Sequence, residues 1–265
     1  PKALMTSRMI VFSDLDGTLL DHETYSFDAA KPALGRLKSE GHILVLASSK
    51  TAAEIAPLRD AMGFSHCPAI VENGAGLLEA GDSGGADDRS AHDDVLAALS
   101  GLPSRLRSRF EGFSDWDVAE VARRTGLSLE EAEKAAMRRF SEPGIWSGSD
   151  ADLEEFVVLL SQSGITGARG GRFFTLSHGS TKASQMDAIV AMYPDAGGDP
   201  KTLALGDAPN DIPMLEKADL GIIIANRAHA GIGPLQGEAA GTIIRSVELG
   251  PEGWNEEMLR VLDTR

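Results

Sequence analysis

Short, largely apolar runs alternate with helix-like segments at both ends of the chain. These runs of three to five residues are Met9–Ser13, Ile43–Ala47, Ala69–Val71, Thr202–Leu205, Leu220–Ile224 and Thr242–Ile244. Runs without polar alternation predict strands that are buried on both faces. Between them, apolar residues at helical spacing predict helices over Ala29–Glu40, Thr51–Met62 and Thr181–Met192. Strands that alternate with helices favour an α/β fold with a doubly wound parallel sheet.

The middle of the chain, from about Gly81 to His178, has a different pattern. It begins with a polar, glycine-rich stretch, Asp82–Asp88, which predicts a loop or linker. The elements expected after it are helices over 115–124, 129–140 and Ala151–Gln162, and a hairpin from Ile165–Ala168 to Arg172–Leu176 that turns at Gly170-Gly171. Ser114-x-x-Asp117 and Ser128-x-x-Glu131 resemble capping boxes at the starts of the first two helices. We therefore expect an inserted α/β domain over 82–177, and one core from 1–81 and 178–265.

The composition is that of a globular protein with an acidic surface. The 265 residues include 25 Lys+Arg and 40 Asp+Glu, and the net charge of −15 argues against nucleic acid or an anionic membrane as a partner. A single cysteine, Cys67, excludes an internal disulfide and a cysteine-based metal site. No run reaches the roughly 18 apolar residues of a membrane span, and the first residues lack the apolar run of a signal peptide. We expect a cytoplasmic setting. Because the protein is negatively charged, binding of an anionic substrate would need a metal ion or a local cluster of cations.

Two carboxylates follow the first predicted strand directly, at Asp14 and Asp16. Ligands of open parallel sheets bind at the carboxyl ends of the strands. Paired carboxylates there suit Mg²⁺, which prefers oxygen ligands, and a carboxylate can also attack phosphorus as a nucleophile. The alternative is an ordinary Asx turn before Gly17.

Other strand ends carry further polar residues. Ser48-Ser49-Lys50 follows the second strand, and Gly206-Asp207-Ala208-Pro209-Asn210-Asp211 follows the strand Thr202–Leu205. The Ser48 hydroxyl could bind a phosphoryl oxygen, although Ser48 or Ser49 could equally cap the next helix. Helix capping is also the alternative for the aspartates of the second set. Lys182 begins a predicted helix, where a cation opposes the macrodipole, so it pairs with an anion or lies solvated on the surface.

Taken in order, these residues resemble a known set of motifs. Asp14-x-Asp16-Gly17-Thr18, Ser48, Lys182 and Gly206-Asp207-x-x-Asn210-Asp211 are similar to the four motifs of the haloacid dehalogenase superfamily of phosphotransferases. The insertion between the second and third motifs resembles the type II cap group, which includes the Cof-like sugar phosphatases. The resemblance implies a Rossmann-like core and an inserted cap that determines substrate specificity.

The resemblance also implies a role for each motif residue. Asp14 would be the nucleophile that forms an aspartyl-phosphate, and Asp16 the general acid and base. Mg²⁺ would be held by Asp14, the backbone carbonyl of Asp16 and Asp207, with Asp211 orienting the site. The remaining two motif residues, Lys182 and Ser48, would bind phosphoryl oxygens.

A narrower similarity is to the mannosyl-3-phosphoglycerate phosphatases. The segments that carry it are Ser48-Ser49-Lys50-Thr51, Glu72-Asn73-Gly74, Thr125-Gly126-Leu127, Arg138-Arg139-Phe140-Ser141-Glu142-Pro143 and Gly170-Gly171-Arg172-Phe173. The similarity implies hydrolysis of mannosyl-3-phosphoglycerate to phosphate and mannosylglycerate, a compatible solute. Candidate substrate-binding residues are Lys50 and Arg172 for the carboxylate, Glu142 for sugar hydroxyls, and Glu72, Asn73 and Asn210. The alternatives are that Arg172 only flanks a hairpin, that Glu142 faces solvent and that Glu72-Asn73-Gly74 is only a turn.

Other functions are compatible with the same motifs. The nearest is hydrolysis of glucosyl-3-phosphoglycerate or of sugar phosphates in general; a phosphomutase and a non-catalytic sugar-phosphate-binding module are more distant. Intact Asp14 and Asp16 argue against a binding module, which needs no nucleophile beside an acid. The large insertion argues against a mutase. The sequence leaves open which sugar the substrate carries and which oligomeric state the protein adopts.

Overall fold

The computed structural model describes residues 8–85, 88–194, 200–228 and 230–264, and the two ends of this chain build one sheet. Its strands in spatial order are β11 (Ile243–Leu249), β10 (Leu220–Ala225), β9 (Lys201–Gly206), β1 (Met9–Ser13) and β2 (Ile43–Leu46). All neighbouring strands pair in parallel, which confirms the predicted α/β fold. Because Ser13 of β1 lies opposite Leu205 of β9, the residues that follow these two strands meet at one edge of the sheet.

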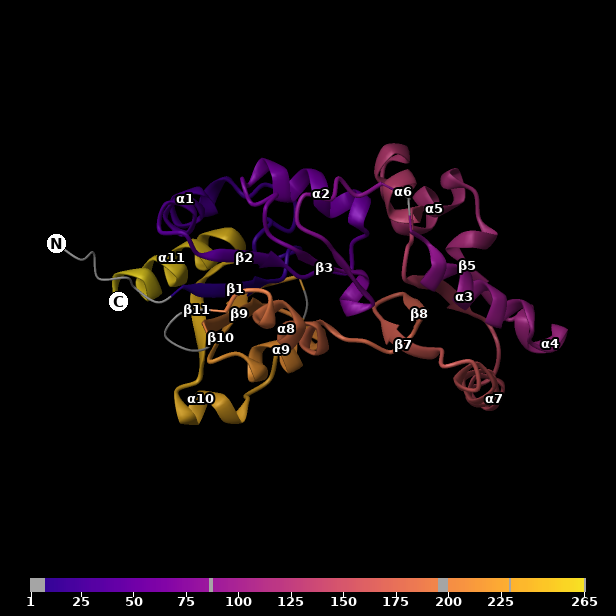
Figure 1. The fold of residues 1–265 in the computed structure, drawn as a ribbon. Helices are drawn as coiled ribbons and strands as arrows, with labels where there is room; N and C mark the ends of the chain where they lie inside the picture. The colour runs from indigo at the N-terminus through magenta and orange to yellow at the C-terminus, as the bar shows by residue number, and fades with distance from the viewer. Residues whose placement is uncertain (1–7, 86–87, 195–199, 229, 265) are drawn as a thin grey trace.

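Helices cover both faces of this sheet (Figure 1). The helices α1 (Lys31–Ser39) and α11 (Gly250–Asp263) pack together on one face, and α8 (Lys182–Ala191) and α9 (Ile212–Lys217) on the other. The helix α2 (Ala52–Ala61) follows β2, and the short α10 (Gln236–Ala240) precedes β11. The strands and the inward helix faces bury one large apolar cluster. Within the described ranges, no helix is long and apolar enough to cross a membrane.

The predicted strand Ala69–Val71 is present as β3, but it is not a strand of the parallel sheet. It pairs antiparallel with β4 (Gly76–Leu78), which the sequence did not predict, and touches the parallel sheet through the bridge between Ala47 and Ile70. The two strands are joined by the turn η2 (Glu72–Gly74), in which all three residues have positive φ angles.

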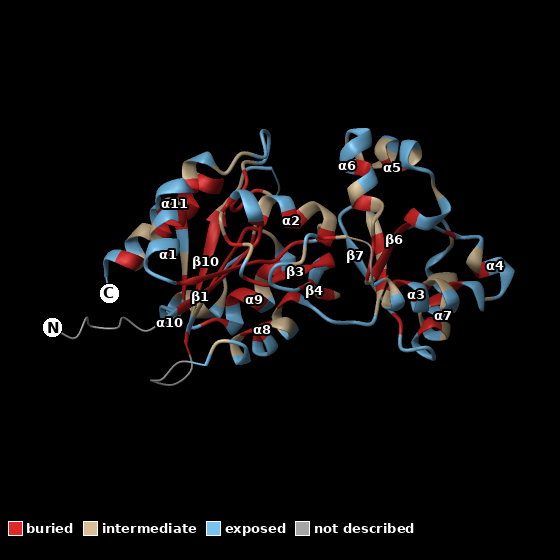
Figure 2. Ribbon diagram, turned by 45° about the horizontal axis from the view of Figure 1, so that its top comes forward, coloured by how far each residue is buried: buried red, intermediate tan, exposed pale blue. Residues whose placement is uncertain are grey.

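The middle of the chain forms a second, antiparallel sheet. Its strands lie in the order β5 (Phe110–Gly112), β6 (Ser141–Trp146), β8 (Phe173–Ser177) and β7 (Thr166–Gly170). The accompanying helices are α3 (Ser90–Ser100), α4 (Ser104–Arg107), α5 (Val118–Thr125), α6 (Leu129–Ala136) and α7 (Asp150–Ser161). These elements bury apolar clusters of their own, and Figure 2 shows buried positions gathered separately in the two parts. We use "cap" for residues 82–177, the boundaries expected from the sequence, and "core" for the rest; residues 86–87 of the expected linker lie outside the described residues.

Two predictions of helix ends in the cap were wrong. The helix α6 begins at the expected capping box of Ser128 and Glu131 but ends at Ala136, not at residue 140. The backbone beyond it turns away because Glu72 of the core accepts hydrogen bonds from the amides of Arg139 and Phe140. The cap of α5 is not Ser114, which lies in the 3-10 turn η3 (Phe113–Asp115), but Asp117, whose side chain accepts from the amide of Glu120.

Candidate active site

Three carboxylates meet at the carboxyl ends of β1 and β9. Asp14 follows β1, Asp207 follows β9, and Asp211 ends the short turn η4 (Pro209–Asp211). All three are buried, and their carboxylate oxygens lie within 4.8 Å of one another. Such a cluster is unstable without compensating positive charge, since buried carboxylates repel one another and lose their hydration.

Lys182 supplies part of that charge. Its ammonium donates to Asp14 Oδ1 and to Asp211 Oδ1, both at 2.7 Å, and the residue is only 3 % exposed. The alternative of a solvated surface lysine is therefore wrong. Burial lowers the pKa of Lys182, but the carboxylates of Asp14 and Asp211 outweigh it and hold that pKa above its usual value. Burial, opposed by Lys182 and reinforced by Asp211, raises the pKa of Asp14 to about 8.

The position of Lys182 depends on a close approach between η2 and the start of α8. A Cβ on Gly74, whose φ is +96°, would lie 2.0 Å from the carbonyl carbon of Thr181. The contact is reinforced by Gln185, which donates to the carbonyl of Gly74 at 2.8 Å. Thr181 caps the helix together with Ser184. A glycine is required at residue 74 because no side chain fits between the turn and the helix.

Asp211 connects Lys182 to the loop after β9. While Oδ1 accepts from Lys182, Oδ2 accepts from the backbone amides of Asp207 and Ala208, both at 3.2 Å. The sequence left helix capping and a site role as alternatives for this aspartate. In the structure Asp211 has both roles, because Oδ2 caps the local backbone and Oδ1 lies in the carboxylate cluster. Asp211 thus fixes the loop that carries Asp207.

Asp207 is itself held by two neighbours. Its Oδ1 accepts from the Thr18 hydroxyl at 3.1 Å, and its Oδ2 accepts from Nδ2 of Asn226 at 2.5 Å. A Cβ on Gly17, with a φ of +80°, would lie 2.2 Å from Nδ2 of Asn226, so a glycine is needed there too. Asn226 was not among the residues expected from the sequence, although it follows β10, the strand next to β9, and the strand-end rule that found Asp207 applies to it as well.

Asp16 and Lys50 form a second, more accessible pair. Lys50 Nζ lies 3.2 Å from Asp16 Oδ1 and 5.4 Å from the ring centroid of Tyr25, and the Asp16 side chain is 37 % exposed. Burial lowers the pKa of Lys50, but the carboxylates of Asp16 and Glu54 raise it by more, so that the net direction is upward. An accessible carboxylate beside a cation is suitably placed to exchange protons with a ligand or with water.

Ser48, Asn73 and Asn210 lie together, as a shared site requires. The buried Ser48 accepts from the amide of Asn73 at 2.9 Å through its carbonyl and from the amide of Lys50 at 3.2 Å through its hydroxyl. Asn210 donates to the side chain of Asn73 at 3.4 Å. Neither Ser48 nor Ser49 caps α2, since Thr51 takes that position with Glu54. Within the described residues the Ser48 hydroxyl donates to no protein atom, so it can donate to a ligand oxygen.

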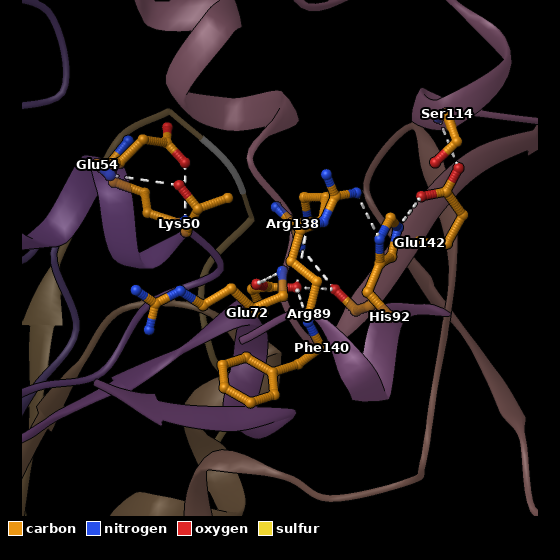
Figure 3. Close-up of polar contacts among 12 residues, drawn as sticks. Lys50, Glu54, Glu72, Arg89, His92, Ser114, Arg138, Phe140 and Glu142 are labelled. Atoms are coloured by element: carbon orange, nitrogen blue, oxygen red, sulfur yellow. Dashed lines mark hydrogen bonds and ion pairs between the residues drawn. The ribbon is translucent and has the colours of Figure 1, made fainter. Parts of the chain in front are cut away.

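The other expected substrate contacts are bonded to protein atoms. Glu142 is buried, with Oε2 2.7 Å from His92 Nε2 and Oε1 accepting from the amide of Ser114 at 2.7 Å (Figure 3). The alternative of a solvent-facing Glu142 is therefore wrong. The guanidinium of Arg172 donates to the last carbonyls of α5, at 2.9 and 3.0 Å. Glu72 binds the cap segment beyond α6. Direct contacts of these three residues with substrate stay predictions.

The donor set of the cluster fits a hard divalent cation. Asp14, Asp207 and Asp211 offer carboxylate oxygens, the ligands that Mg²⁺ prefers. The three buried aspartates outnumber the single ammonium of Lys182, and a divalent ion would supply the missing positive charge.

A family model and several solved structures match this chain. Residues 11–95 and 148–231 match the family model of haloacid dehalogenase-like hydrolases. The fold is similar to that of the phosphatase BT1666 from Bacteroides thetaiotaomicron, with a TM-score of 0.67, 18 % identity, and 100 % of this chain and 98 % of that one covered. It is also similar to the subclass IIB sugar phosphatase BT4131 (TM-score 0.59, 17 % identity, 96 % and 98 % covered). A third similar structure is the sucrose-phosphatase of Synechocystis sp. PCC6803 in complex with sucrose and phosphate (TM-score 0.58, 13 % identity, 96 % and 98 % covered). The chain belongs to the haloacid dehalogenase-like hydrolases.

Proposed function

We propose that this protein is a Mg²⁺-dependent phosphatase that forms an aspartyl-phosphate on Asp14. The observation that carries the proposal is the position of Lys182, whose ammonium bonds to Asp14 and Asp211 within a buried cluster of carboxylates. A nucleophile and a cation in contact can receive the negative charge of a phosphoryl group between them. A simple binding site would not need a buried carboxylate where an anion must approach.

The reaction takes place in two displacements. In the first, a carboxylate oxygen of Asp14 attacks phosphorus, the bond from phosphorus to the ester oxygen breaks, and Asp16 donates a proton to the departing oxygen. In the second, Asp16 takes a proton from water as that water attacks phosphorus, which releases phosphate and regenerates Asp14. The accessibility of Asp16, in contrast to the buried Asp14, supports this division of roles.

Other residues of the site stabilise the transferred group. Lys182 and the Ser48 hydroxyl bind its oxygens. The side-chain amide of Asn210 donates to Asn73, whose backbone amide bonds to the carbonyl of Ser48. Asp14, Asp207 and the backbone carbonyl of Asp16 would hold Mg²⁺, which supplies positive charge to the phosphoryl oxygens when bound. Asp211 and Asn226 keep the ligands in place.

For the substrate we propose mannosyl-3-phosphoglycerate, hydrolysed to mannosylglycerate and phosphate. The five segments that resemble the mannosyl-3-phosphoglycerate phosphatases support this choice, and three of them lie in the cap. Lys50 is close to the nucleophile loop through Asp16 and is suited to the glycerate carboxylate. Glucosyl-3-phosphoglycerate and sugar phosphates in general are the second candidates, because the catalytic residues do not distinguish between them.

Phosphate release tests the reaction and the substrate together. We would measure it with mannosyl-3-phosphoglycerate, glucosyl-3-phosphoglycerate, 3-phosphoglycerate and hexose phosphates, each with Mg²⁺ and with EDTA. Asp14→Asn is the matched control, since it keeps the shape of the side chain and removes the nucleophile. Metal-dependent release from the glycosylated phosphoglycerates, absent in Asp14→Asn, is the expected result. Similar rates on all esters would refute the narrow substrate, and no release by folded protein would refute the phosphatase.

A further inference from the structure

The cap segment Arg138–Ser141, between α6 and β6, lies against the core. The ring of Phe140 packs with the apolar residues of the core, so close to Gly76 of β4 that a Cβ there would lie 2.3 Å from a ring atom. Glu72 of the core turn η2 accepts from the amides of Arg139 at 2.9 Å and Phe140 at 3.3 Å. Figure 3 shows Glu72 beside Arg138 and Phe140, so this segment of the cap is in contact with the core.

Both oxygens of the Glu72 carboxylate are used in this contact. Oε1 accepts from the Arg139 amide, and Oε2 accepts from the Ser141 hydroxyl at 2.6 Å as well as from Phe140. The Nε of Arg138 lies 3.3 Å from Oε2, and its guanidinium donates to the Ser141 hydroxyl at 2.7 Å. Glu72 is 2 % exposed, and among the described residues the cation paired with it is Arg138 of the cap. Removing one partner from such a buried set is costly, because the other partners stay buried without it.

The backbone of the same turn holds the loops of the candidate active site. The amide of Glu72 donates to the carbonyl of Lys50, and the amide of Asn73 to the carbonyl of Ser48, both at 2.9 Å. The third residue of the turn, Gly74, lies against the peptide that begins α8 at Lys182. Glu72 and Asn73 have φ angles of 51° and 59°, which a non-glycine residue adopts only where its surroundings fix it.

We propose that Glu72 is a positioning residue that sets where the cap lies relative to Ser48, Lys50 and Lys182. The backbone of Glu72 bonds to the loop that carries Ser48 and Lys50, and its side chain bonds to the cap. One residue therefore contacts both. The inference rests on the proposed phosphatase function. It replaces the expected direct contact of Glu72 with substrate, because both carboxylate oxygens are bonded to protein. Glu72 therefore acts on specificity through the cap and leaves the chemistry at phosphorus to the core.

The test compares two esters in the full-length protein. Mannosyl-3-phosphoglycerate (or, in its place, the sugar phosphate that the wild type hydrolyses fastest) needs the cap for recognition, whereas p-nitrophenyl phosphate has a leaving group without sugar or carboxylate. We expect Glu72→Ala to lower kcat/KM for the sugar ester by about tenfold to a hundredfold, the size of effect that misplaced groups produce. We expect p-nitrophenyl phosphate hydrolysis to change by less than about threefold. Glu72→Gln, whose single carbonyl oxygen can replace only one of the two acceptor oxygens, should fall between.

A matched control and a second measurement separate the possible outcomes. Glu257→Gln removes another buried carboxylate, paired with Arg260 in α11, and should leave the ratio of the two substrates unchanged. Equal loss on both esters in Glu72→Ala, or no loss on either, would overturn the positioning role. If the wild type hydrolyses neither ester, the phosphatase proposal fails. Hydrogen exchange of backbone amides then tests whether Glu72 holds the cap segment, independently of activity. Faster exchange at Arg139 and Phe140 in Glu72→Ala is then expected, and unchanged exchange would contradict it.

Discussion

At the scale of single residues, the electrostatics of the site depend on one ammonium. Lys182 lies between Asp14 and Asp211, and both of these aspartates are buried. Among the described residues, no other cation is in contact with these two carboxylates. The same ammonium is also the group that a phosphoryl oxygen would meet beside the nucleophile. Stability and turnover therefore depend on the same atom.

Lys182→Met, which keeps the length of the side chain and removes its charge, should affect both quantities. Turnover should fall by about a hundredfold to a thousandfold, the range found when a charge-stabilising group is removed from a transition state. The unfolding free energy without Mg²⁺ should fall by about 3–5 kcal/mol, as when a buried ion pair loses one partner. Steady-state kinetics and urea unfolding measure the two effects. Lys217→Met, which removes an exposed pair with Asp187, is the control, and equal behaviour of the two variants would contradict the prediction.

Asn226 offers a test of the metal site that leaves every proposed ligand in place. Its amide donates to Asp207 Oδ2, and loss of such an outer partner typically weakens metal binding by about tenfold to a hundredfold. We expect Asn226→Ala to raise the Mg²⁺ concentration for half-maximal activity by that factor. The thermal shift on adding Mg²⁺ to EDTA-treated protein should need correspondingly more metal. Asn255→Ala, which removes an acceptor for the amide of Ala33 at the start of α1, should leave the Mg²⁺ dependence unchanged.

At the scale of elements, the fit between the turn η2 and helix α8 determines where Lys182 lies. Gly74→Ala should destabilise the protein by about 1–2 kcal/mol for the left-handed backbone and by about 1–3 kcal/mol more for the collision with Thr181. Gly126→Ala is the matched control, because Gly126 has a similar φ of +81° and open space at its Cβ. Denaturant unfolding of both variants separates the two contributions. Equal losses of unfolding free energy in the two variants would mean that α8 moves away from the new methyl group without destabilising the protein.

A second prediction at this scale concerns the contact between α10 and β11. Hydrogen bonds from Arg245, with the amide of Leu235, lower the pKa of Glu238 to about 2. Because the pKa is lower in the folded than in the unfolded protein, the carboxylate stabilises the fold above about pH 4.5, and this contribution disappears as the pH falls toward 2. The difference in unfolding free energy between wild type and Glu238→Gln should therefore shrink from about pH 6 to about pH 3. A difference that does not change with pH would contradict the prediction.

The elements also show what sequence reasoning can reach. The strands before Asp14 and Asp207 were predictable because a short apolar run that ends in an acidic turn rarely forms anything but a buried strand. The strand β6 was not, because Pro143 and Gly144 lie within it and its alternation is weak. The end of α6 was out of reach for another reason, since the carboxylate that turns the backbone there belongs to Glu72, far earlier in the chain. Contacts between distant segments of this kind leave no local pattern in the sequence.

At the scale of the whole molecule, the core and the cap bury separate apolar clusters of different size. The core cluster includes strands β1, β2, β9 and β10 with the helices on both faces, whereas the main cap cluster is a much smaller group around Phe110, Phe156 and Leu176. Contacts across the boundary join the two, such as the bond of Glu72 with the amide of Arg139 and the packing of the Phe140 ring against the core. Burial of apolar area provides most of the driving force for folding, so the two parts differ in stability.

We therefore expect the cap to unfold before the core on heating. Calorimetry should give a calorimetric enthalpy larger than the van't Hoff enthalpy, which indicates more than one cooperative unit. Amide exchange should protect β1 and β9 by a larger free energy than β5 to β8. Glu72→Ala, which removes a contact across the boundary, should separate the two transitions further, whereas Glu257→Gln should lower the core transition alone. A single two-state transition with uniform protection would mean that the contacts across the boundary join core and cap into one cooperative unit.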